Sequence, residues 1–216
     1  MPEYEKINTL YKRYMERGPN KGRIIEGEYS KEEFRMINYW EVTEKIDGVN
    51  IRIELAPWDL EGTLVVPFFG GRTDKAVIPT QLRTNLEKHF DKIELSKIFD
   101  MGKADNVTLY CEGYGAGIQK GGKYSDEQTF IMYDILIDDV WLEREKVEEF
   151  AKQLNMECVP LIGMMQTDEI VEFVKSKPKS HFGDFPLEGV VCRSKPLLLD
   201  RMGRRVAWKL KIVDFK

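Results

Sequence analysis

The sequence predicts an α+β fold in which antiparallel sheets are flanked by helices. Several short segments, for example 49–55 and 107–112, alternate apolar and polar residues with the period of a half-buried strand. The segment that follows Pro79 carries apolar residues at helical spacing instead. No linker, repeat or break in composition divides the 216 residues, so we expect a single domain over 1–216.

The first part of this domain is predicted to be basic and partly helical. Residues 3–17 place four apolar side chains on one side of an amphipathic helix, and a glycine- and proline-containing loop follows. We therefore describe residues 1–37 as a basic N-terminal segment of helix and loop. Its cationic residues are Lys12, Arg13, Arg17, Lys21 and Arg23.

The rest of the chain divides into strands and helices by its periodicity and its turn residues. One helix carries Leu82, Leu86, Phe90 and Ile93; a second is predicted to be capped by Asp138 or Asp139, and a third by Thr167. Strands are expected at 39–43, 49–55, 63–69, 107–112, 130–137, 187–193 and 205–212.

Composition and charge narrow the range of functions. The net charge of -4 excludes a protein coated in positive charge, so any contact with nucleic acid must come from local basic clusters. No segment has the apolar length of a membrane helix, and three separated cysteines are typical of a reduced, cytoplasmic protein. With only two histidines, a zinc site or a Ser-His-Asp triad is hard to assemble.

The most informative stretch runs from Glu44 to Arg52. It places Lys45 and Asp47 at a tight turn made by Gly48, and the strand that follows presents Asn50 and Arg52 on its polar face. Lysines, arginines and glutamates recur beside glycine turns in later strands. Ionisable groups gathered around one lysine indicate an active site. These further residues are Arg72, Glu112, Glu188, Lys209 and Lys211.

Lys45-Ile46-Asp47-Gly48 resembles the nucleophile motif (Lys-x-Asp-Gly) of the covalent nucleotidyltransferases, which include ATP- and NAD-dependent ligases and GTP-dependent mRNA capping enzymes. Five later segments resemble the other motifs of that superfamily in the same order. The chain is similar to RNA ligase 2 and its nick-sealing relatives at three places: Asn50, which follows Gly48, and the segments 115–120 and 205–211. Asp47 departs from that branch, in which some members carry a histidine. The five later segments are 71–73, 110–113, 130–135, 187–191 and 206–211.

The resemblance implies a nucleotidyltransferase domain of the ATP-grasp-like ligase adenylation type, acting as an ATP-dependent RNA ligase. Lys45 would attack ATP to form lysyl-AMP, the AMP would pass to a 5′-phosphate, and a 3′-hydroxyl would displace it. Lys209 and Lys211 would grip the α-phosphate, and Glu188 would hold Mg²⁺ or Mn²⁺. An amine must be neutral to attack, and neighbouring cations favour the neutral form.

The same resemblance implies how the nucleotide is bound. Glu112 would accept hydrogen bonds from the ribose, and Tyr133 would stack on the purine. Arg72 matches the arginine that follows the nucleophile motif. We expect Glu44 to accept from the adenine amino group, which would favour ATP over GTP. Asp47 is assigned to catalysis, and Asn50 and Arg52 are assigned to nucleotide binding.

No accessory domain is expected after the last motif. Either the basic N-terminal segment, a protein partner or a dimer would help to hold RNA, or the protein would act slowly and bind nucleic acid weakly. The expected substrates are RNA ends, in a nicked or splinted duplex, as in RNA repair. Two alternatives stay open. The chain could be a minimal DNA ligase or a GTP-dependent capping-type enzyme, or, in another class, an inactive module that binds nucleotide or RNA ends.

Overall fold

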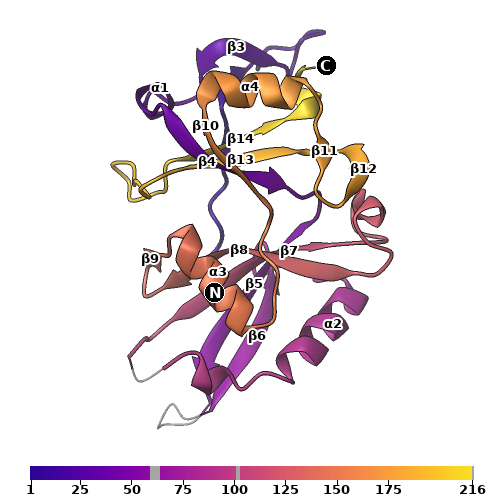
Figure 1. The fold of residues 1–216 in the computed structure, drawn as a ribbon, viewed down its shortest axis with the longest axis vertical. Helices are drawn as coiled ribbons and strands as arrows, with labels where there is room; N and C mark the ends of the chain where they lie inside the picture. The colour runs from indigo at the N-terminus through magenta and orange to yellow at the C-terminus, as the bar shows by residue number, and fades with distance from the viewer. Residues whose placement is uncertain (59–63, 101–102, 216) are drawn as a thin grey trace. The chain divides into compact units, whose positions relative to one another are not determined.

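Figure 1 shows the computed structural model, which describes residues 1–58, 64–100 and 103–215. The contacts divide the chain into two compact units. The first consists of Met1–Tyr4 and Asp47–Val159, and the second of Glu5–Ile46 and the chain from Pro160 onward. Each unit has its own sheet and its own hydrophobic core, and the strands are largely antiparallel, so the predicted α+β fold class is confirmed.

The first unit is built on a fully antiparallel five-stranded sheet in the order β6-β5-β7-β8-β9. Two helices contribute Leu82, Leu86, Val147 and Ala151 to the core against this sheet. The elements are β5 (Val49–Pro57), β6 (Val65–Gly71), α2 (Thr80–Phe90), η1 (Leu95–Lys97), β7 (Val107–Tyr114), η2 (Gly121–Lys123), β8 (Thr129–Ile137), β9 (Val140–Trp141) and α3 (Arg144–Gln153). The predicted start of β6 at Thr63 lies outside the described residues.

A row of polar side chains crosses the three central strands of this sheet and is covered by Met1–Tyr4. Arg52 on β5 is paired with Tyr110 on β7, and Tyr110 with Asp134 on β8. Arg52 donates to the carbonyl oxygen of Met1, Tyr110 donates to that of Pro2, and Tyr4 donates to the carboxylate of Asp134. Arg52 was predicted to lie on the polar, exposed face of β5. This prediction is wrong, because Arg52 is completely buried.

The second unit contains a five-stranded sheet in the order β1-β14-β13-β4-β10, with α4 packed against it. Only its β1–β14 pair is parallel among the pairs described. Trp40, Val190, Trp208 and Ile170 form the centre of its core. The elements are β1 (Asn8–Thr9), β2 (Tyr11–Arg13), β3 (Ile24–Tyr29), α1 (Glu33–Met36), β4 (Tyr39–Lys45), β10 (Leu161–Gln166), α4 (Thr167–Lys175), β11 (Lys179–Ser180), β12 (Gly183–Pro186), β13 (Gly189–Ser194), β14 (Ala207–Lys211) and η3 (Ile212–Phe215).

The prediction of a helix over 3–17 is wrong, because this segment forms the strands β1 and β2. The backbone N–H of Leu10 donates to Lys209, and that of Tyr14 donates to Arg23, both over about 3 Å (3.1 and 3.0 Å). Pairing with distant segments thus satisfies backbone groups that a helix would satisfy locally, and tyrosine and threonine favour the extended form.

The cap predictions for two helices are also wrong. Asp138 and Asp139 adopt positive φ angles of 46° and 64° in the turn between β8 and β9, and α3 begins after Glu143. The N-cap of α4 is Gln166, whose backbone N–H donates to Glu169 at 2.8 Å. The hydroxyl of Thr167 instead accepts a hydrogen bond from the Trp40 indole.

Among the residues that the structure describes, no helix is long and apolar enough to cross a membrane.

Candidate active site

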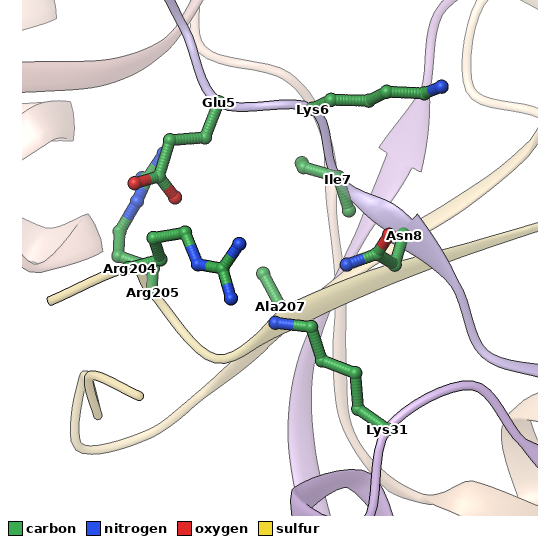
Figure 2. A pocket seen from close by; sticks show the side chains of 8 residues that line it. All are labelled: Glu5, Lys6, Ile7, Asn8, Lys31, Arg204, Arg205 and Ala207. Atoms are coloured by element: carbon green, nitrogen blue, oxygen red, sulfur yellow. The ribbon is translucent and has the colours of Figure 1, made fainter. Parts of the chain in front are cut away.

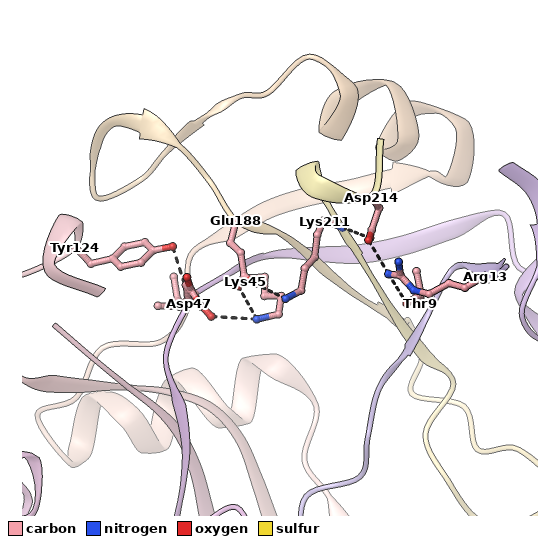
Figure 3. A network of polar contacts seen from close by, with 9 residues as sticks. Thr9, Arg13, Lys45, Asp47, Tyr124, Glu188, Lys211 and Asp214 are labelled. Atoms are coloured by element: carbon pink, nitrogen blue, oxygen red, sulfur yellow. Dashed lines mark hydrogen bonds and ion pairs between the residues drawn. The ribbon is translucent and has the colours of Figure 1, made fainter. Parts of the chain in front are cut away.

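In the second unit, three adjacent strands bring together a group that we call the lysine cluster: Lys45, Lys209, Lys211 and Glu188. Figure 3 shows Lys45, Lys211 and Glu188 of this group. Gly189 on β13 is paired with Lys45 on β4 and with Lys211 on β14, so Glu188, directly before β13, lies between these two lysines. On β14, Trp208 and Leu210 are buried in the core, and the alternation of the strand puts Lys209 and Lys211 on the opposite face.

Glu188 bridges two of the lysines with its two carboxylate oxygens. Lys45 Nζ lies 2.6 Å from Oε2, and Lys211 Nζ lies 2.5 Å from Oε1. All three side chains are mostly buried, so solvent screens these ion pairs less than it would screen pairs on an open surface. The carboxylate therefore fixes the spacing of two ammonium groups at the ends of the two strands that flank β13.

Lys209 completes the cluster and carries its clearest electrostatic perturbation. Its pKa is lowered below the ordinary 10.5, first by burial and then by the positive charges of Lys45, Lys211 and Lys6, and Glu188 opposes the shift. A half-buried lysine among like charges loses its proton more easily than a free one. Such a concentration of positive charge suits a phosphate group.

The carboxylate of Glu44, the residue before Lys45, forms hydrogen bonds within the protein. It is nearly buried, and its two oxygens accept hydrogen bonds from the hydroxyl of Ser180 at 2.5 Å and from the backbone N–H of His181 at 2.9 Å. The carboxylate thus anchors the β11–β12 hairpin to the strand that ends in Lys45. The contact of Glu44 with adenine stays a prediction. It is compatible with these two hydrogen bonds, because a carboxylate can accept further ones.

The cluster also meets the simplest requirement for a divalent metal. No group of three or more histidine, cysteine or acidic residues that could hold a metal occurs within the described part of the chain. Mg²⁺ is commonly held by one or two carboxylates together with phosphates of the substrate, and it retains several waters. The single carboxylate of Glu188, beside lysines that are predicted to hold the α-phosphate, fits that donor set.

In the first unit, Asn50, Glu112 and Tyr133 form a second group of predicted residues. Asn50 on β5 is paired with Glu112 on β7, and its amide nitrogen donates to the hydroxyl oxygen of Tyr133 on β8. The pKa of Tyr133 is raised well above its usual value, first by burial and then by Tyr4, Glu112 and Asp134. The phenol is therefore neutral, and its ring is braced by an edge-on contact with Tyr4 at 5.0 Å.

The turn at Asp47 and Gly48 is pressed against this group. A Cβ at Gly48 would collide with the carbonyl oxygen of Gly113 and would lie 2.9 Å from Cγ of Glu112. Only glycine therefore lets the turn approach Glu112 so closely. The backbone N–H of Asp47 donates to the hydroxyl of Tyr124 at 3.4 Å, a contact that the sequence analysis did not anticipate.

Arg52 and Arg72 have different surroundings although both were assigned to the nucleotide. Arg52 is completely buried; its guanidinium donates to the carbonyl oxygens of Gly71 and Met1, both at 2.6 Å, and to Asp74 at 2.9 Å. Arg72 is exposed directly after Gly71. Arg52 therefore holds the strand end from which Arg72 projects, and it is not presented to a ligand.

Several cations line a separate pocket of about 220 Å³ in the second unit (Figure 2). Lys31 and Arg204 both bond the carboxylate of Asp200, and the bond to Arg204 is the main reason that the pKa of Asp200 is held well below its ordinary range. Much of the positive charge is thus neutralised locally. The lining residues include none of the predicted site residues: they are Glu5, Lys6, Ile7, Asn8, Lys31, Arg204, Arg205 and Ala207.

Two contacts of the cluster were missed by the sequence analysis. Asp214 accepts a hydrogen bond from the backbone N–H of Lys211 at 2.9 Å, and Arg13 forms an ion pair with Asp214 at 2.6 Å (Figure 3). The spacing of three residues between Lys211 and Asp214 was the only local signal. Arg13 lies 201 residues away in sequence and gave no signal of this pairing.

Comparison with known proteins shows the family to which this chain belongs. The sequence profile of the RNA ligase family matches residues 38–211, so the chain belongs to the RNA ligase family. The comparison with curated proteins returned no significant match.

Solved structures of an RNA ligase from Naegleria gruberi share the fold. The match to a mutant with ATP and Mn has a TM-score of 0.59 at 18% identity, and it covers 82% of this chain and 50% of the Naegleria chain. A mutant with AMP and Mn has a TM-score of 0.60 at 18% identity, covering 82% and 51%. The structure with PPi has a TM-score of 0.57 at 19% identity, covering 82% and 50%. The chain thus spans about half the length of these ligases.

Proposed function

We propose that this protein is an ATP-dependent RNA ligase that joins a 3′-hydroxyl to a 5′-phosphate through a lysyl-AMP intermediate. The observation that carries the proposal is the lysine cluster, in which one carboxylate holds Lys45 and Lys211 and a third lysine with a lowered pKa lies beside them. Membership of the RNA ligase family supports the same reaction.

In the first step, the neutral amine of Lys45 attacks the α-phosphorus of ATP. The N–P bond forms as the bond from phosphorus to the pyrophosphate oxygen breaks, and the amine loses a proton. Lys209 and Lys211 stabilise the charge on the transferring phosphoryl group. Glu188 holds the amine of Lys45 in place beforehand, which reduces the entropy lost on reaching an in-line geometry.

Glu188 would also hold Mg²⁺ or Mn²⁺, which, when bound, neutralises charge on the phosphates. The Naegleria structures with ATP, AMP and Mn support this choice of nucleotide and metal.

For the nucleoside we assign three residues of the first unit. Glu112 accepts from the ribose hydroxyls, Tyr133 offers its ring to the purine, and Asn50 fixes the phenol of Tyr133. Arg72, exposed at the end of β6, contributes positive charge to the phosphates. Asp47 completes the nucleophile motif, and Glu44 contacts adenine while it anchors the β11–β12 hairpin.

In the later steps, AMP is transferred from Lys45 to the 5′-phosphate of an RNA end, and the 3′-hydroxyl attacks that phosphate and releases AMP. Nicked or splinted duplexes are the expected substrates, because the complementary strand holds the two ends in line. The segment that carries Lys12, Lys21 and Arg23 offers cations for the RNA backbone, with a protein partner or a dimer as a further source of contacts.

Labelling with nucleotide tests this proposal. The protein and a Lys45→Ala variant are incubated with [α-³²P]ATP and Mg²⁺ and separated on a denaturing gel, in parallel with labelled GTP and NAD. Label on the wild-type protein from ATP alone, absent from the variant, is the expected result. Label from GTP or NAD instead would indicate a capping-type enzyme or a DNA ligase, and no label from any of them would contradict the enzyme and favour a binding module.

Strand joining is tested separately with a nicked RNA duplex whose 5′ end is already adenylylated. The expected product is a joined strand formed without added ATP. Adduct formation without joining of RNA, but with joining of a DNA nick, would contradict the RNA assignment.

A further inference from the structure

We infer that Asp214, held by Arg13, is a positioning residue for Lys211, so that the β2–β3 hairpin and the phosphate-binding lysine are linked through one buried carboxylate. This inference rests on the proposed function for its catalytic consequence, but the hydrogen bonds that carry it are features of the second unit alone.

The backbone of Lys211 needs a partner where β1 turns away from β14. Strand β1 runs parallel to β14, with Thr9 opposite Lys209, and the N–H of Leu10 donates to the carbonyl oxygen of Lys209 at 3.1 Å. In a continued parallel ladder, the N–H of Lys211 would donate to the carbonyl oxygen of Leu10. That oxygen instead accepts from the N–H of Ser30 at 2.9 Å.

Asp214 supplies the missing acceptor. Its Oδ2 lies 2.9 Å from the backbone nitrogen of Lys211, three residues earlier, and the turn η3 brings the carboxylate back over the end of β14. The last residue of the strand is therefore held on both sides, by pairing with Gly189 on β13 and by Asp214. This fixes the point from which the Lys211 side chain reaches Glu188.

Arg13 pairs with the buried carboxylate and holds it in place. The Asp214 side chain is only 3% exposed, and burying an unpaired carboxylate is costly. Arg13 Nη2 donates to Asp214 Oδ1 at 2.6 Å and to Thr9 at 3.2 Å, and Nη1 donates to the carbonyl oxygen of Gly22 at 2.6 Å. The guanidinium is thus anchored on β1 and on the hairpin loop, as Figure 3 shows for Thr9 and Asp214.

Asp200 provides a matched control in the same unit. Its side chain is also nearly buried, pairs with Lys31 and Arg204, and accepts backbone hydrogen bonds from Met202 at 2.9 Å and Arg204 at 3.0 Å. It holds a loop before β14 and has no bond to the lysine cluster among the described contacts. Asp200→Ala therefore removes a similar buried carboxylate without releasing Lys211.

The test measures single-turnover adenylylation for wild type, Asp214→Ala, Asp214→Asn and Asp200→Ala, with melting temperatures for each. Asp214→Ala should lower the maximal rate by about 10- to 100-fold, with the KM for ATP changed by less than about threefold, because a displaced lysine weakens the transition state more than the ground state. Asp214→Asn should recover part of the lost rate, since its amide oxygen can still accept from Lys211, whereas its amide nitrogen cannot accept from Arg13. Asp200→Ala should keep the wild-type rate.

A double variant separates positioning from loss of fold. In a Lys211→Ala background, Asp214→Ala should have no further effect on the rate, because the residue through which it acts is gone. An equal loss in both backgrounds, a wild-type rate for Asp214→Ala, or no recovery in Asp214→Asn would overturn the inference.

Hydrogen exchange distinguishes failure of this inference from failure of the proposed function. The backbone amide of Lys211 should be protected in wild type and should exchange faster in Asp214→Ala, while Asp200→Ala leaves it unchanged. This holds whether or not wild type forms an adduct. Equal exchange in wild type and Asp214→Ala would overturn the positioning role even in an active ligase.

Discussion

Single residues in the lysine cluster carry charges that the proposed reaction would use and that are costly for folding. Lys209 is half-buried beside Lys45 and Lys211, and burial together with these charges lowers its pKa. Groups that bind or transfer phosphate often oppose stability in this way, because the ligand, and not the protein, supplies the compensating charge.

Replacing Lys209 by Met should therefore stabilise the protein near neutral pH. A lysine whose folded pKa lies below 10.5 destabilises the folded state at every pH below that folded pKa, where it is charged in both states. Lys209→Met should raise the melting temperature at pH 7 by about 2–4 °C. The difference should shrink as the pH rises through the folded pKa of Lys209 towards 10.5, where the wild-type lysine loses its proton in the folded state.

Thermal melts of both proteins across pH 7 to 10 measure this effect, and adenylylation by the variant should be strongly reduced. A variant less stable than wild type at pH 7 would contradict the assignment of a costly charge to Lys209.

At this scale, the sequence predicted the lysine cluster well because each member stands in a short local motif beside a glycine or on an alternating strand. Lys45, Glu188, Lys209 and Lys211 do meet in one sheet. Arg52 was predicted to face a ligand because the alternation of the strand puts it on the same face as Asn50. Alternation does not show what covers that face, and Arg52 is completely buried. The cover is Met1–Tyr4, about fifty residues earlier in the chain.

Among the elements, β5 depends on contacts across its supposedly open face. Arg52 links β5 to the carbonyl oxygens of Gly71 and Met1, and so joins the end of β6 to the first residues of the chain. The buried guanidinium of Arg52 therefore holds the sheet together next to Arg72, which follows Gly71.

Arg52→Ala should lower the free energy of unfolding by about 2–4 kcal/mol, because it leaves buried carbonyl groups without donors and opens a cavity. Arg83→Ala is the control, since Arg83 forms an exposed pair with Glu87 on α2 and should change the value by less than about 0.5 kcal/mol. Urea unfolding compares the two. Equal, small effects would show that Arg52 is not the link described here.

The turn between Lys45 and β5 is a second element with a sharp steric requirement. Gly48→Ala should destabilise the protein and abolish adenylylation, because the added methyl group would force the turn away from Gly113 and Glu112. Gly122→Ala is the matched control, since a Cβ at Gly122 would lie 3.7 Å from Cα of Ala116, an ordinary van der Waals contact. Melting temperature and adduct yield measure both variants, and a folded, active Gly48→Ala protein would contradict the close approach.

The elements that the sequence predicted correctly are those with several periods of alternation or of helical spacing, such as β4, β5, β7, β8 and α2. The N-terminal segment was assigned wrongly because two- and three-residue strands contain too few residues to show a period. Their extended form depends on β14 and β3, whose positions a local pattern does not contain.

For the whole molecule, the chain passes between two units, each with its own core and sheet, after Tyr4, after Ile46 and after Val159. The second crossing lies inside the Lys45–Gly48 motif, between Ile46 and Asp47. No sequence signal marks these boundaries, because the chain goes from strand to turn without a linker, and the division follows from which residues contact one another in space.

Because the net charge of the chain is -4, RNA must be bound by local cations and not by an overall positive charge. The two stages of the proposed reaction should therefore depend differently on salt. Sealing requires local cations to neutralise RNA phosphates, so raising monovalent salt from about 50 to 200 mM should lower the sealing rate by about 10- to 100-fold at subsaturating RNA. Adenylylation at saturating ATP should change by less than about threefold, because its charges are close together and partly buried. Parallel rate measurements over the salt range test this, and equal salt dependence of both stages would contradict it.

The most direct test of the account is the position of the covalent nucleotide. Wild-type protein incubated with ATP and Mg²⁺ is digested, and the peptides are analysed by mass spectrometry for one added adenylyl group. We predict the group on Lys45 alone, with its loss when pyrophosphate is added back. An adenylyl group on Lys209 or Lys211, or none on any lysine under conditions where the protein is folded, would contradict the assignment of Lys45 as the nucleophile.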